Sequence, residues 1–471
     1  MARRDLTNDS IAEGILSLSL PMIAGSVLQA SQSLIDMFFV SRLGPKALAA
    51  VGMSGTVLML LMTAFIGLHV ATAAMVARAF GAQDRDGADH AAGQAFLLSL
   101  LLSAAVAIVG FLASERLLTE LAPKADQKVI RLAAAYLHVM FTGIFFTCAY
   151  FLTAGVFRAC GDAMTPFVIA VLATVLNMIL TPLLIFGHLG FPALGVRGSA
   201  VATVASQAVG FAIALYLLTR DYTPLNIRWK HLKPDVRVLW RITVIGVPSA
   251  AQMSLRTLMN LALLAIVATF GDLVVAAYTV GMRIRMLGMF PFFGFAVSAA
   301  TMVGQNLGAG KPERSERSAW TAAAMAFGVA CIGAAAFITF APAIIRVFSD
   351  KPEVVAPGTA VLRIGAAGML AASVAIVMSR ALTGAGDTVS PFVISLICLW
   401  GFQIPAAIYL SGTREISAFG LNAAVPGEWI FRRVSLDSPN GVWWAMVAAS
   451  VLHAAIVTAW FMTGRWKHKT I

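Results

Sequence analysis

The sequence predicts an all-α membrane protein with twelve transmembrane helices, arranged as two parallel six-helix repeats. Three observations support this fold class. First, 59% of the 471 residues are hydrophobic and only 12% are charged, which is more apolar surface than one water-soluble core would bury. Second, apolar stretches of about 20 residues recur from 15 to 462, each long enough to cross about 30 Å of hydrocarbon. Third, the two halves of the chain repeat the same turns.

Polar or glycine-containing connections separate the apolar stretches into individual spans. We expect these at 14–41, 48–76, 93–114, 131–156, 165–187, 197–219, 242–269, 274–303, 319–341, 357–380, 390–411 and 441–464. The first is expected to be a retained span and not a signal peptide, because it is too long for a signal-peptide core and no small-x-small cleavage site follows it.

The internal repeat divides the chain into two lobes. Pro21 and Pro248 lie 227 residues apart, as do the motifs VARAFGAQ and VGQNLGAG, whereas CGDAMTPF and AGDTVSPF lie 225 apart. A last pair, Gly195 and Gly441, is offset by 246, which places an insertion of about 21 residues in the polar loop 411–440. We therefore expect an N-terminal lobe at 1–219, a basic cytoplasmic linker at 220–241 and a C-terminal lobe at 242–471. Because six is even, both copies enter the membrane from the same side.

The distribution of charge favours lipid headgroups over nucleic acid as the partner of the basic residues. The net charge is +12, but the basic residues lie in short connections and not along one periodic face. Residues including Arg158, the linker and Arg380 are expected on the inner side, which predicts a multi-pass protein of a bacterial inner membrane with both termini in the cytoplasm. The connections on the other side also contain basic residues. We expect a monomer.

Motifs of catalysis and cofactor binding are not found in the sequence. The four cysteines lack metal-ligand or disulfide spacing, and there is no phosphate-binding glycine loop, no HExxH and no nucleophile elbow. We therefore expect no enzyme and no cofactor. Gly81, Gly308 and Gly310, which end two of the repeated segments, are interpreted as turn formers that need a positive φ.

Asp36 is the carboxylate that we expect well inside a span, where a charge costs about 2.5–3.5 kcal/mol. Asn177 and Thr181 lie one helical turn apart in the fifth span, and the sixth span contains Thr203. These hard oxygen ligands suit a proton or a small cation, so the four residues are predicted to form a cation-coupling site. No metal site is certain, but Na+ at Asp36 and Asn177 is compatible with the pattern.

Two more ordinary interpretations of these residues stay open. Asp36 would also be explained as the ion-pair partner of Arg256, or of Arg283 or Arg285, and the amide and hydroxyls as hydrogen bonds between helices. A comparison of the lobes favours a coupling role, because every proposed ligand becomes apolar at the repeat offset. The equivalents of the four positions are Leu263, Phe402, Ala406 and Ala449.

Arg256, Arg285 and Met282 are the candidate residues of a substrate cavity in the second lobe. The two arginines would bind an anionic or zwitterionic group, whereas Met282 belongs to a span rich in Met and Phe, whose flexible side chains suit varied hydrophobic molecules. Packing is the more ordinary role for Met282. Arg283 and Arg285 are about 200° apart around a helix, so they cannot both face the cavity.

These motifs resemble the multidrug and toxic compound extrusion (MATE) family over nearly the whole chain. The resemblance lies in LPMI followed by Asp36, the paired GA turns, the two GDxxxPF segments and GVRGSAVATVASQ. It implies a V-shaped, two-lobed secondary antiporter that exports small organic, often cationic, compounds against inward proton or sodium flow. By resemblance, Asp36, Asn177 and Thr203 match coupling positions of the first lobe.

Two departures from the family pattern affect the expected chemistry. Thr181 stands where many members have a second acid, and Arg256 where another branch has an acid in the seventh span. The sequence therefore favours protons over sodium and puts the usual preference for cationic drugs in question. The alternative is a lipid-linked precursor flippase of the wider superfamily, with Arg256 and Arg285 as anion ligands, although such proteins commonly have additional spans. A membrane-embedded enzyme or channel is a third hypothesis.

Overall fold

Long helices account for most of the chain. The computed structural model describes residues 5–123, 125–220, 225–348, 351–418, 421–424 and 435–469. Within these ranges eleven helices are long and apolar enough to cross a membrane, and a bent pair makes twelve. The predicted all-α fold with twelve spans is therefore confirmed. Part of the predicted linker, 221–224, lies outside the described residues.

The first lobe contains seven helices, because one of its spans is broken. They are α1 (Ile11–Ser41), α2 (Pro45–Gly81), α3 (Arg85–Leu121), α4 (Gln127–Thr142), α5 (Ile144–Ala159), α6 (Met164–Phe186) and α7 (Val196–Leu218). The fourth predicted span, 131–156, consists of α4 and α5, which meet at Gly143 with a bend of 54°.

The second lobe repeats this plan without the sharp break. Its elements are α8 (Val236–Ala268), α9 (Asp272–Gly308), α10 (Pro312–Arg346), α11 (Pro352–Gly384), α12 (Val389–Ser395), the π-helical η2 (Leu396–Gln403), α13 (Ile404–Ser411) and α15 (Asn440–Met462). Short 3-10 helices η1 (Trp229–Leu232) and η3 (Arg465–His468) precede α8 and follow α15. In the polar loop 411–440, strands β1 (Glu415–Ala418) and β2 (Leu421–Ala424) form an antiparallel hairpin.

Several helices are longer than the sequence predicts. The third span, expected at 93–114, is the 37-residue helix α3, whose N-terminus is capped by Asp84 accepting a hydrogen bond from the Gly87 N–H at 2.9 Å. Hydropathy marks the part of a helix that lies in hydrocarbon, whereas capping and packing extend the helix into the polar layers.

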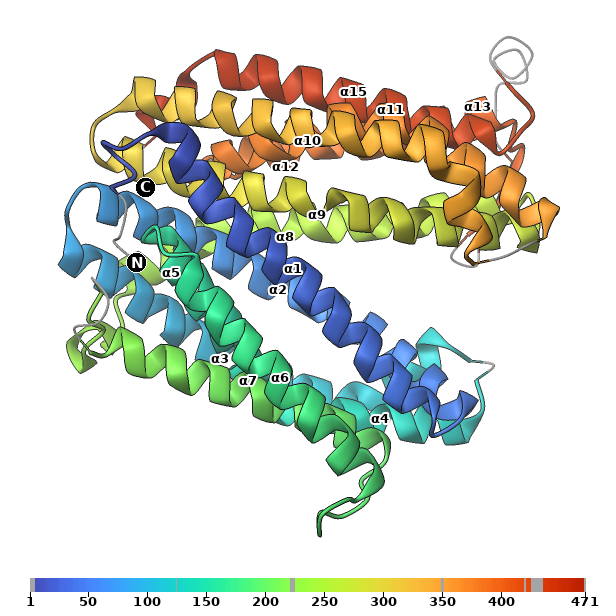
Figure 1. Ribbon diagram of the computed structural model, residues 1–471, viewed down its shortest axis with the longest axis horizontal. Helices are drawn as coiled ribbons and strands as arrows, with labels where there is room; N and C mark the ends of the chain where they lie inside the picture. The colour runs from blue at the N-terminus through green and yellow to red at the C-terminus, as the bar shows by residue number, and fades with distance from the viewer. Residues whose placement is uncertain are drawn as a thin grey trace.

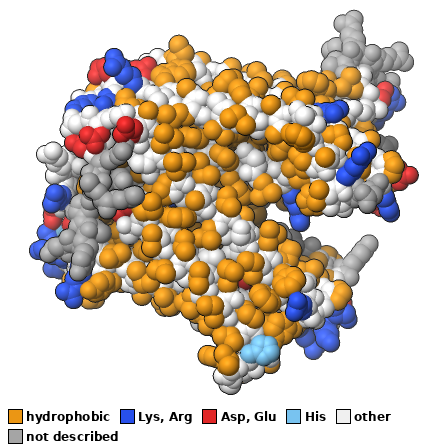
Figure 2. All heavy atoms as spheres, viewed as in Figure 1, with side chains coloured by type: hydrophobic (Ala, Val, Ile, Leu, Met, Phe, Trp, Pro, Cys, Tyr) orange, Lys and Arg blue, Asp and Glu red, His pale blue; other side chains and the backbone are white. Residues whose placement is uncertain are grey.

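The two lobes meet at one end and diverge toward the other. Figure 1 shows α1–α7 and α8–α15 as two groups of helices that lie together at the end with both termini and separate at the opposite end. In Figure 2, hydrophobic side chains cover the middle of the visible face, charged side chains gather at the two ends, and a notch separates the lobes at the end away from the termini. This distribution suits a protein that crosses a bilayer.

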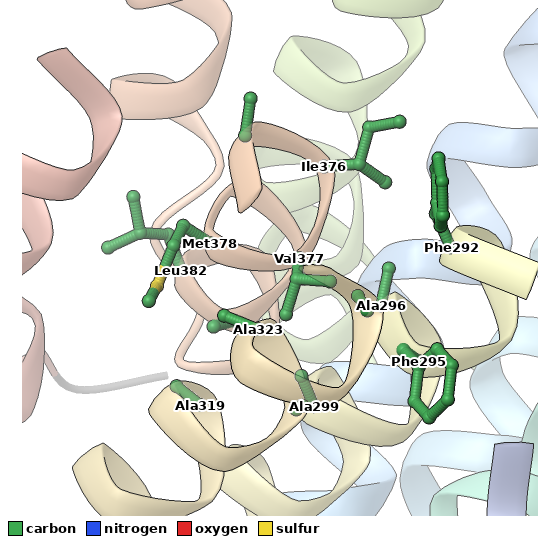
Figure 3. Packing of buried hydrophobic residues seen from close by; sticks show 14 of the residues in the cluster. Phe292, Phe295, Ala296, Ala299, Ala319, Ala323, Ile376, Val377, Met378 and Leu382 are labelled. Carbon is green, nitrogen blue, oxygen red and sulfur yellow. The ribbon is translucent and has the colours of Figure 1, made fainter. Parts of the chain in front are cut away.

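Small residues allow the helices of the second lobe to pack closely. In Figure 3, Ala296 and Ala299 of α9 face Ala319 and Ala323 of α10, beside Val377 of α11, and all five are buried. A Cβ on Gly304 would lie 3.1 Å from the Gly384 carbonyl oxygen. Close backbone approach between helices is the usual means of association in membranes, where lipid is as apolar as the side chains.

Two glycines bring the lobes into backbone contact at the end where the lobes lie together, which we call the closed end. A Cβ on Gly81 would lie 1.9 Å from the Gln305 carbonyl oxygen, and one on Gly308 would lie 2.0 Å from the Arg78 carbonyl oxygen. The prediction that these two glycines need a positive φ is wrong, because they are the helical last residues of α2 and α9. The positive φ values belong to Gln83 (61°) and Gly310 (71°), again 227 residues apart.

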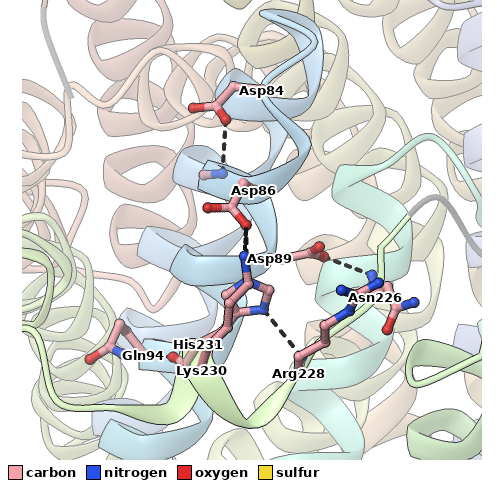
Figure 4. A network of polar contacts seen from close by, with 9 residues as sticks. Asp84, Asp86, Asp89, Gln94, Asn226, Arg228, Lys230 and His231 are labelled. Carbon is pink, nitrogen blue, oxygen red and sulfur yellow. Dashed lines mark hydrogen bonds and ion pairs between the residues drawn. The ribbon is translucent and has the colours of Figure 1, made fainter.

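The linker lies against the first turns of α3 through a polar network. The buried Gln94 amide donates to the carbonyls of His231 and Lys233, both at 2.7 Å, and its oxygen accepts from the Asp235 N–H at 2.9 Å. Figure 4 shows Gln94 beside His231 and Lys230, which also contact Asp86 at 3.1 and 2.5 Å. The network fixes the described part of the linker to the first lobe.

The C-terminal segment is held on the second lobe. Lys469 Nζ lies 2.8 Å from the buried Asp387 carboxylate, and Trp466 is buried against Phe461 with ring centroids 4.6 Å apart. Burial alone would raise the pKa of Asp387, but hydrogen bonds from Lys469 and Ser390 and the Lys469 charge outweigh it and hold the pKa below its ordinary value of 3.8.

Candidate functional site

Asp36 lies in the last third of α1 and contacts α6. Its Oδ1 accepts a hydrogen bond from the Thr181 hydroxyl at 3.0 Å, and the Asp36 side chain is partly buried, whereas Thr181 is fully buried. A carboxylate on a membrane helix must be hydrogen-bonded or solvated to remain charged. The Thr181 hydroxyl supplies one such bond.

Asn177 lies one turn before Thr181 on the same face of α6. Its Nδ2 donates to the Thr203 hydroxyl of α7 at 3.4 Å, and that hydroxyl donates in turn to the Ser199 carbonyl at 3.0 Å. The Asn177 side chain is fully buried, and its Oδ1 has no hydrogen-bond partner among the described residues. The structure thus brings all four sequence-predicted residues to one place between α1, α6 and α7, with an acceptor oxygen still available.

Three further residues extend this cluster and were not identified from the sequence. The Thr174 hydroxyl donates to Gln32 Oε1 at 3.1 Å, one turn before Asp36 on α1 and two turns before Thr181 on α6. The spacing carried a signal, because Gln32 lies four residues before Asp36 and Thr174 three before Asn177. The partly buried Tyr136 of α4 lies within electrostatic range of Asp36. Tyr136 offered no such signal, since its proximity depends on how the broken helix packs.

The ion-pair alternative for Asp36 is not seen. Among the described residues, Asp36 makes no ion pair with any arginine. The repeat-related positions in the second lobe carry apolar side chains, and two of them, Leu263 and Ala449, are fully buried. The oxygen cluster is therefore a feature of one lobe.

The second-lobe candidates lie on α8 and α9. Arg256 and Arg285 are partly buried, and Arg283 is exposed, as their angular separation requires. The Arg285 Nε is buried without a hydrogen-bond partner in the described part of the chain. Met282 is partly buried and packs against the apolar cluster that contains Tyr278 and Trp443.

Two arginines that were expected at the end of a span or just beyond it lie within helices. Arg158 belongs to the last turn of α5, and Arg380 lies in α11, four residues before its end. Both side chains are partly buried, and Arg380 lies within electrostatic range of Arg256. The charge count that predicted orientation treated these residues as loop residues because a hydropathy window ends at the first charge.

Known proteins resemble the chain over almost its whole length. The family model MatE matches residues 21–183 and 248–409, two segments whose starts are 227 residues apart. A probable multidrug resistance protein, YoeA of Bacillus subtilis, is 27% identical over 415 residues, which cover 87% of this chain and 89% of that protein. A FAD transporter of Shewanella oneidensis is 27% identical over 90% of this chain and 93% of its own.

The fold also matches a solved structure. A transporter of the MOP superfamily from Pyrococcus furiosus superposes with a TM-score of 0.86 at 26% identity, covering 99% of this chain and 98% of that one. That protein is described as having a binding pocket of reverse polarity that suggests a different function.

Proposed function

We propose that the chain is a secondary antiporter that exports small organic compounds against an inward flow of protons. It belongs to the MatE family, and a relative described above is named as a probable multidrug resistance protein. Asp36 is the proposed coupling residue. The protein would work as a monomer in the inner membrane of a bacterium, with both termini in the cytoplasm.

The hydrogen bonds around Asp36 support a proton switch. As a carboxylate, Asp36 only accepts hydrogen bonds, and Thr181 supplies a donor at 3.0 Å. Once protonated, Asp36 loses its charge and gains one donor, and the unpartnered Oδ1 of Asn177, one turn along α6, is an available acceptor. Protonation would therefore change the contacts between α1 and α6, and a change that stabilises one arrangement of the lobes shifts the population between outward and inward states.

The composition of the cluster favours protons over sodium. Hard cations prefer several oxygen ligands with enough negative charge, and the cluster has one carboxylate, one free amide oxygen and hydroxyls. Thr181 donates its proton to Asp36 in the present arrangement, so it does not act as a second acid. Sodium at Asp36 and Asn177 is the alternative outcome of the test.

The flippase alternative has less support. The relatives described above are named for multidrug resistance and for FAD, and no named relative among them moves a lipid-linked precursor. These names refer to different kinds of compound, so they do not identify the substrate class of this chain.

The test is transport by the purified chain in proteoliposomes, with rhodamine 6G and carboxyfluorescein as probes and with proton and sodium gradients imposed separately. We expect a proton gradient to drive probe movement in the wild type and Asp36→Asn to abolish it. The matched control is Asp272→Asn, which removes an exposed carboxylate at the N-terminus of α9. Full proton-driven transport by Asp36→Asn would refute the coupling role of Asp36. Transport by the wild type that is driven only by a sodium gradient would identify sodium, and not the proton, as the coupling ion.

A further inference from the structure

Three arginines inside the second lobe have no counter-charge in the part of the chain that the structure describes. Arg256 on α8, Arg285 on α9 and Arg380 on α11 are all partly buried and form no hydrogen bond or ion pair through their side chains with any described residue. The carboxylates of the lobe's spanning helices lie within the first five residues of those helices, as in α9, α10 and α11, and α8, α12, α13 and α15 contain none. The lobe interior is therefore cationic.

Arg256 faces into the second lobe and away from the first. Two residues before it on α8, the Ser254 hydroxyl donates to Thr63 Oγ1 of α2, in the first lobe, at 3.2 Å. Two residues correspond to about 200° around a helix, so Arg256 points to the opposite side. The groups within electrostatic range of Arg256 agree with this direction, since they are Arg285, Arg380 and His453, all on helices of the second lobe.

The three guanidinium groups form a column along the lobe. The Cδ of Arg285 lies 3.7 Å from the position that a Cβ on Gly365 would take, so Arg285 is at the level of Gly365 on α11. Arg380 is 15 residues farther along α11, which corresponds to about 22 Å. Arg256 lies within electrostatic range of both.

Hydrogen-bond donors without acceptors lie along the same column. The Arg285 Nε and the Trp443 Nε1 are both buried and unpartnered among the described residues, and each can only donate. Trp443 stacks on Tyr278, with centroids 5.2 Å apart, and Tyr278 lies two turns before Arg285 on α9. An anion supplies acceptors only, and the aromatic pair beside it suits a flat apolar body.

We propose that the second lobe binds an organic anion, with Arg256 and Arg285 as its charge-recognising residues, the Tyr278–Trp443 pair against its apolar part, and Arg380 adding positive charge farther along the lobe. This inference rests on the proposed antiport function only in taking the bound anion to be the exported compound. The protein would thereby separate two tasks between its lobes. Ion coupling takes place at the oxygen cluster of the first lobe, and the arginines of the second lobe recognise the anion.

Two probes with the same xanthene core and opposite charge test this directly. Equilibrium binding to the purified, detergent-solubilised chain is measured by fluorescence anisotropy with anionic carboxyfluorescein and cationic rhodamine 6G. We expect carboxyfluorescein to bind the more tightly, and Arg256→Gln or Arg285→Gln each to raise its Kd by about tenfold or more, as is typical when a hydrogen bond to a charged group is lost. Arg380→Gln removes a charge farther along the lobe and should raise the Kd by less. The Kd of rhodamine 6G should not rise.

The matched control is Arg283→Gln, which removes an exposed charge two residues from Arg285 and should leave the Kd of carboxyfluorescein unchanged. If a Gln variant does not fold, as judged by size-exclusion chromatography, the corresponding Lys variant keeps the charge but loses the planar fork of donors and should show an intermediate Kd. Added phosphatidylglycerol should not displace the probe. Displacement by this lipid would assign the arginines to headgroups and overturn the proposal.

The outcomes separate this proposal from the antiport function. The anion proposal falls if the wild type binds rhodamine 6G more tightly than carboxyfluorescein, or if Arg256→Gln and Arg285→Gln bind carboxyfluorescein like Arg283→Gln, even where Asp36→Asn abolishes proton-driven transport. Conversely, if binding of carboxyfluorescein depends on the arginines but no proton gradient drives transport of either probe, the anion site stands and the antiport function fails.

Discussion

A methyl group at Gly308 should open the closed end of the molecule. Gly308 ends α9 against the first lobe, and a Cβ there would lie 2.0 Å from the Arg78 carbonyl oxygen and 2.9 Å from the Ala82 nitrogen. Both are backbone atoms, so no side-chain rotation can relieve the overlap. Gly308→Ala therefore requires α9 and α2 to move apart at this point.

The magnitude follows from the overlap. A carbon and a carbonyl oxygen normally approach to about 3.4 Å, so the two backbones must separate by roughly 1.4 Å. Overpacking of this kind typically costs about 1–3 kcal/mol, and because the clash exists only while the end is closed, that cost shifts the equilibrium toward open states by about 5- to 150-fold.

The chain contains its own reporter of this opening. Cys160 is 3% exposed and follows Ala159, whose carbonyl accepts a hydrogen bond from Gln305 of the second lobe at 2.7 Å. In a background where the exposed Cys331 is replaced by Ala, the rate of Cys160 labelling by a hydrophilic maleimide should rise in Gly308→Ala by the factor above. Labelling through transient opening follows the population of the open state when closing is fast.

A matched glycine controls for the effect of alanine in a helix. Gly328 in α10 has no heavy atom within 4 Å of the position that a Cβ would take, so Gly328→Ala should leave the labelling rate unchanged. If Gly308→Ala labels no faster than Gly328→Ala, the closed end does not depend on this backbone contact, and the reasoning is wrong.

Three further predictions concern other contacts. Gln94→Leu removes three hydrogen bonds, one of them to the carbonyl of the buried His231, so it should lower the free energy of unfolding by about 2–4 kcal/mol in thermal melts. Gln127→Leu at an exposed position should stay within about 0.5 kcal/mol of wild type. Thr181→Val removes the donor to the first-lobe carboxylate and should reduce proton-driven transport about tenfold or more, with Thr181→Ser near wild type. The pKa of Asp387 is lower than its ordinary value, so Asp387 stabilises the packing of the C-terminal segment on the second lobe above pH 3.8. This stabilisation is lost as the pH falls through the lower pKa of the folded state. Hydrogen exchange of the C-terminal segment should accordingly show constant protection between about pH 5 and 8 in the wild type and reduced protection at neutral pH in Asp387→Asn.

The sequence determined the number and order of the spans because apolar length and internal repetition are properties of the chain itself. It could not give the break at Gly143, since a glycine inside an apolar run marks a place where a helix can bend without showing whether packing bends it. Nor did it give the role of Gly81 and Gly308, which depends on what lies opposite them in the other lobe.

The first-lobe cluster was predictable for a similar reason. Asp36 is conspicuous in an apolar span, and Asn177 and Thr181 share a helix face by spacing alone. Arg380 was predicted to be the last residue of its span, because a charge near the end of an apolar stretch can belong to the helix or to the loop that follows. Only the path of α11 beyond it shows that the guanidinium lies inside the lobe, near Arg256.

The two glycine contacts at the closed end are reciprocal. Gly81 meets the carbonyl of Gln305 while Gly308 meets that of Arg78, and each residue in one contact is 227 positions from its counterpart in the other. Reciprocity of this kind defines an isologous interface between two identical subunits related by a twofold axis. An ancestral six-helix protein would have needed only one glycine and one opposing turn to dimerise in this way, and gene fusion would have preserved the interface while freeing each half to specialise.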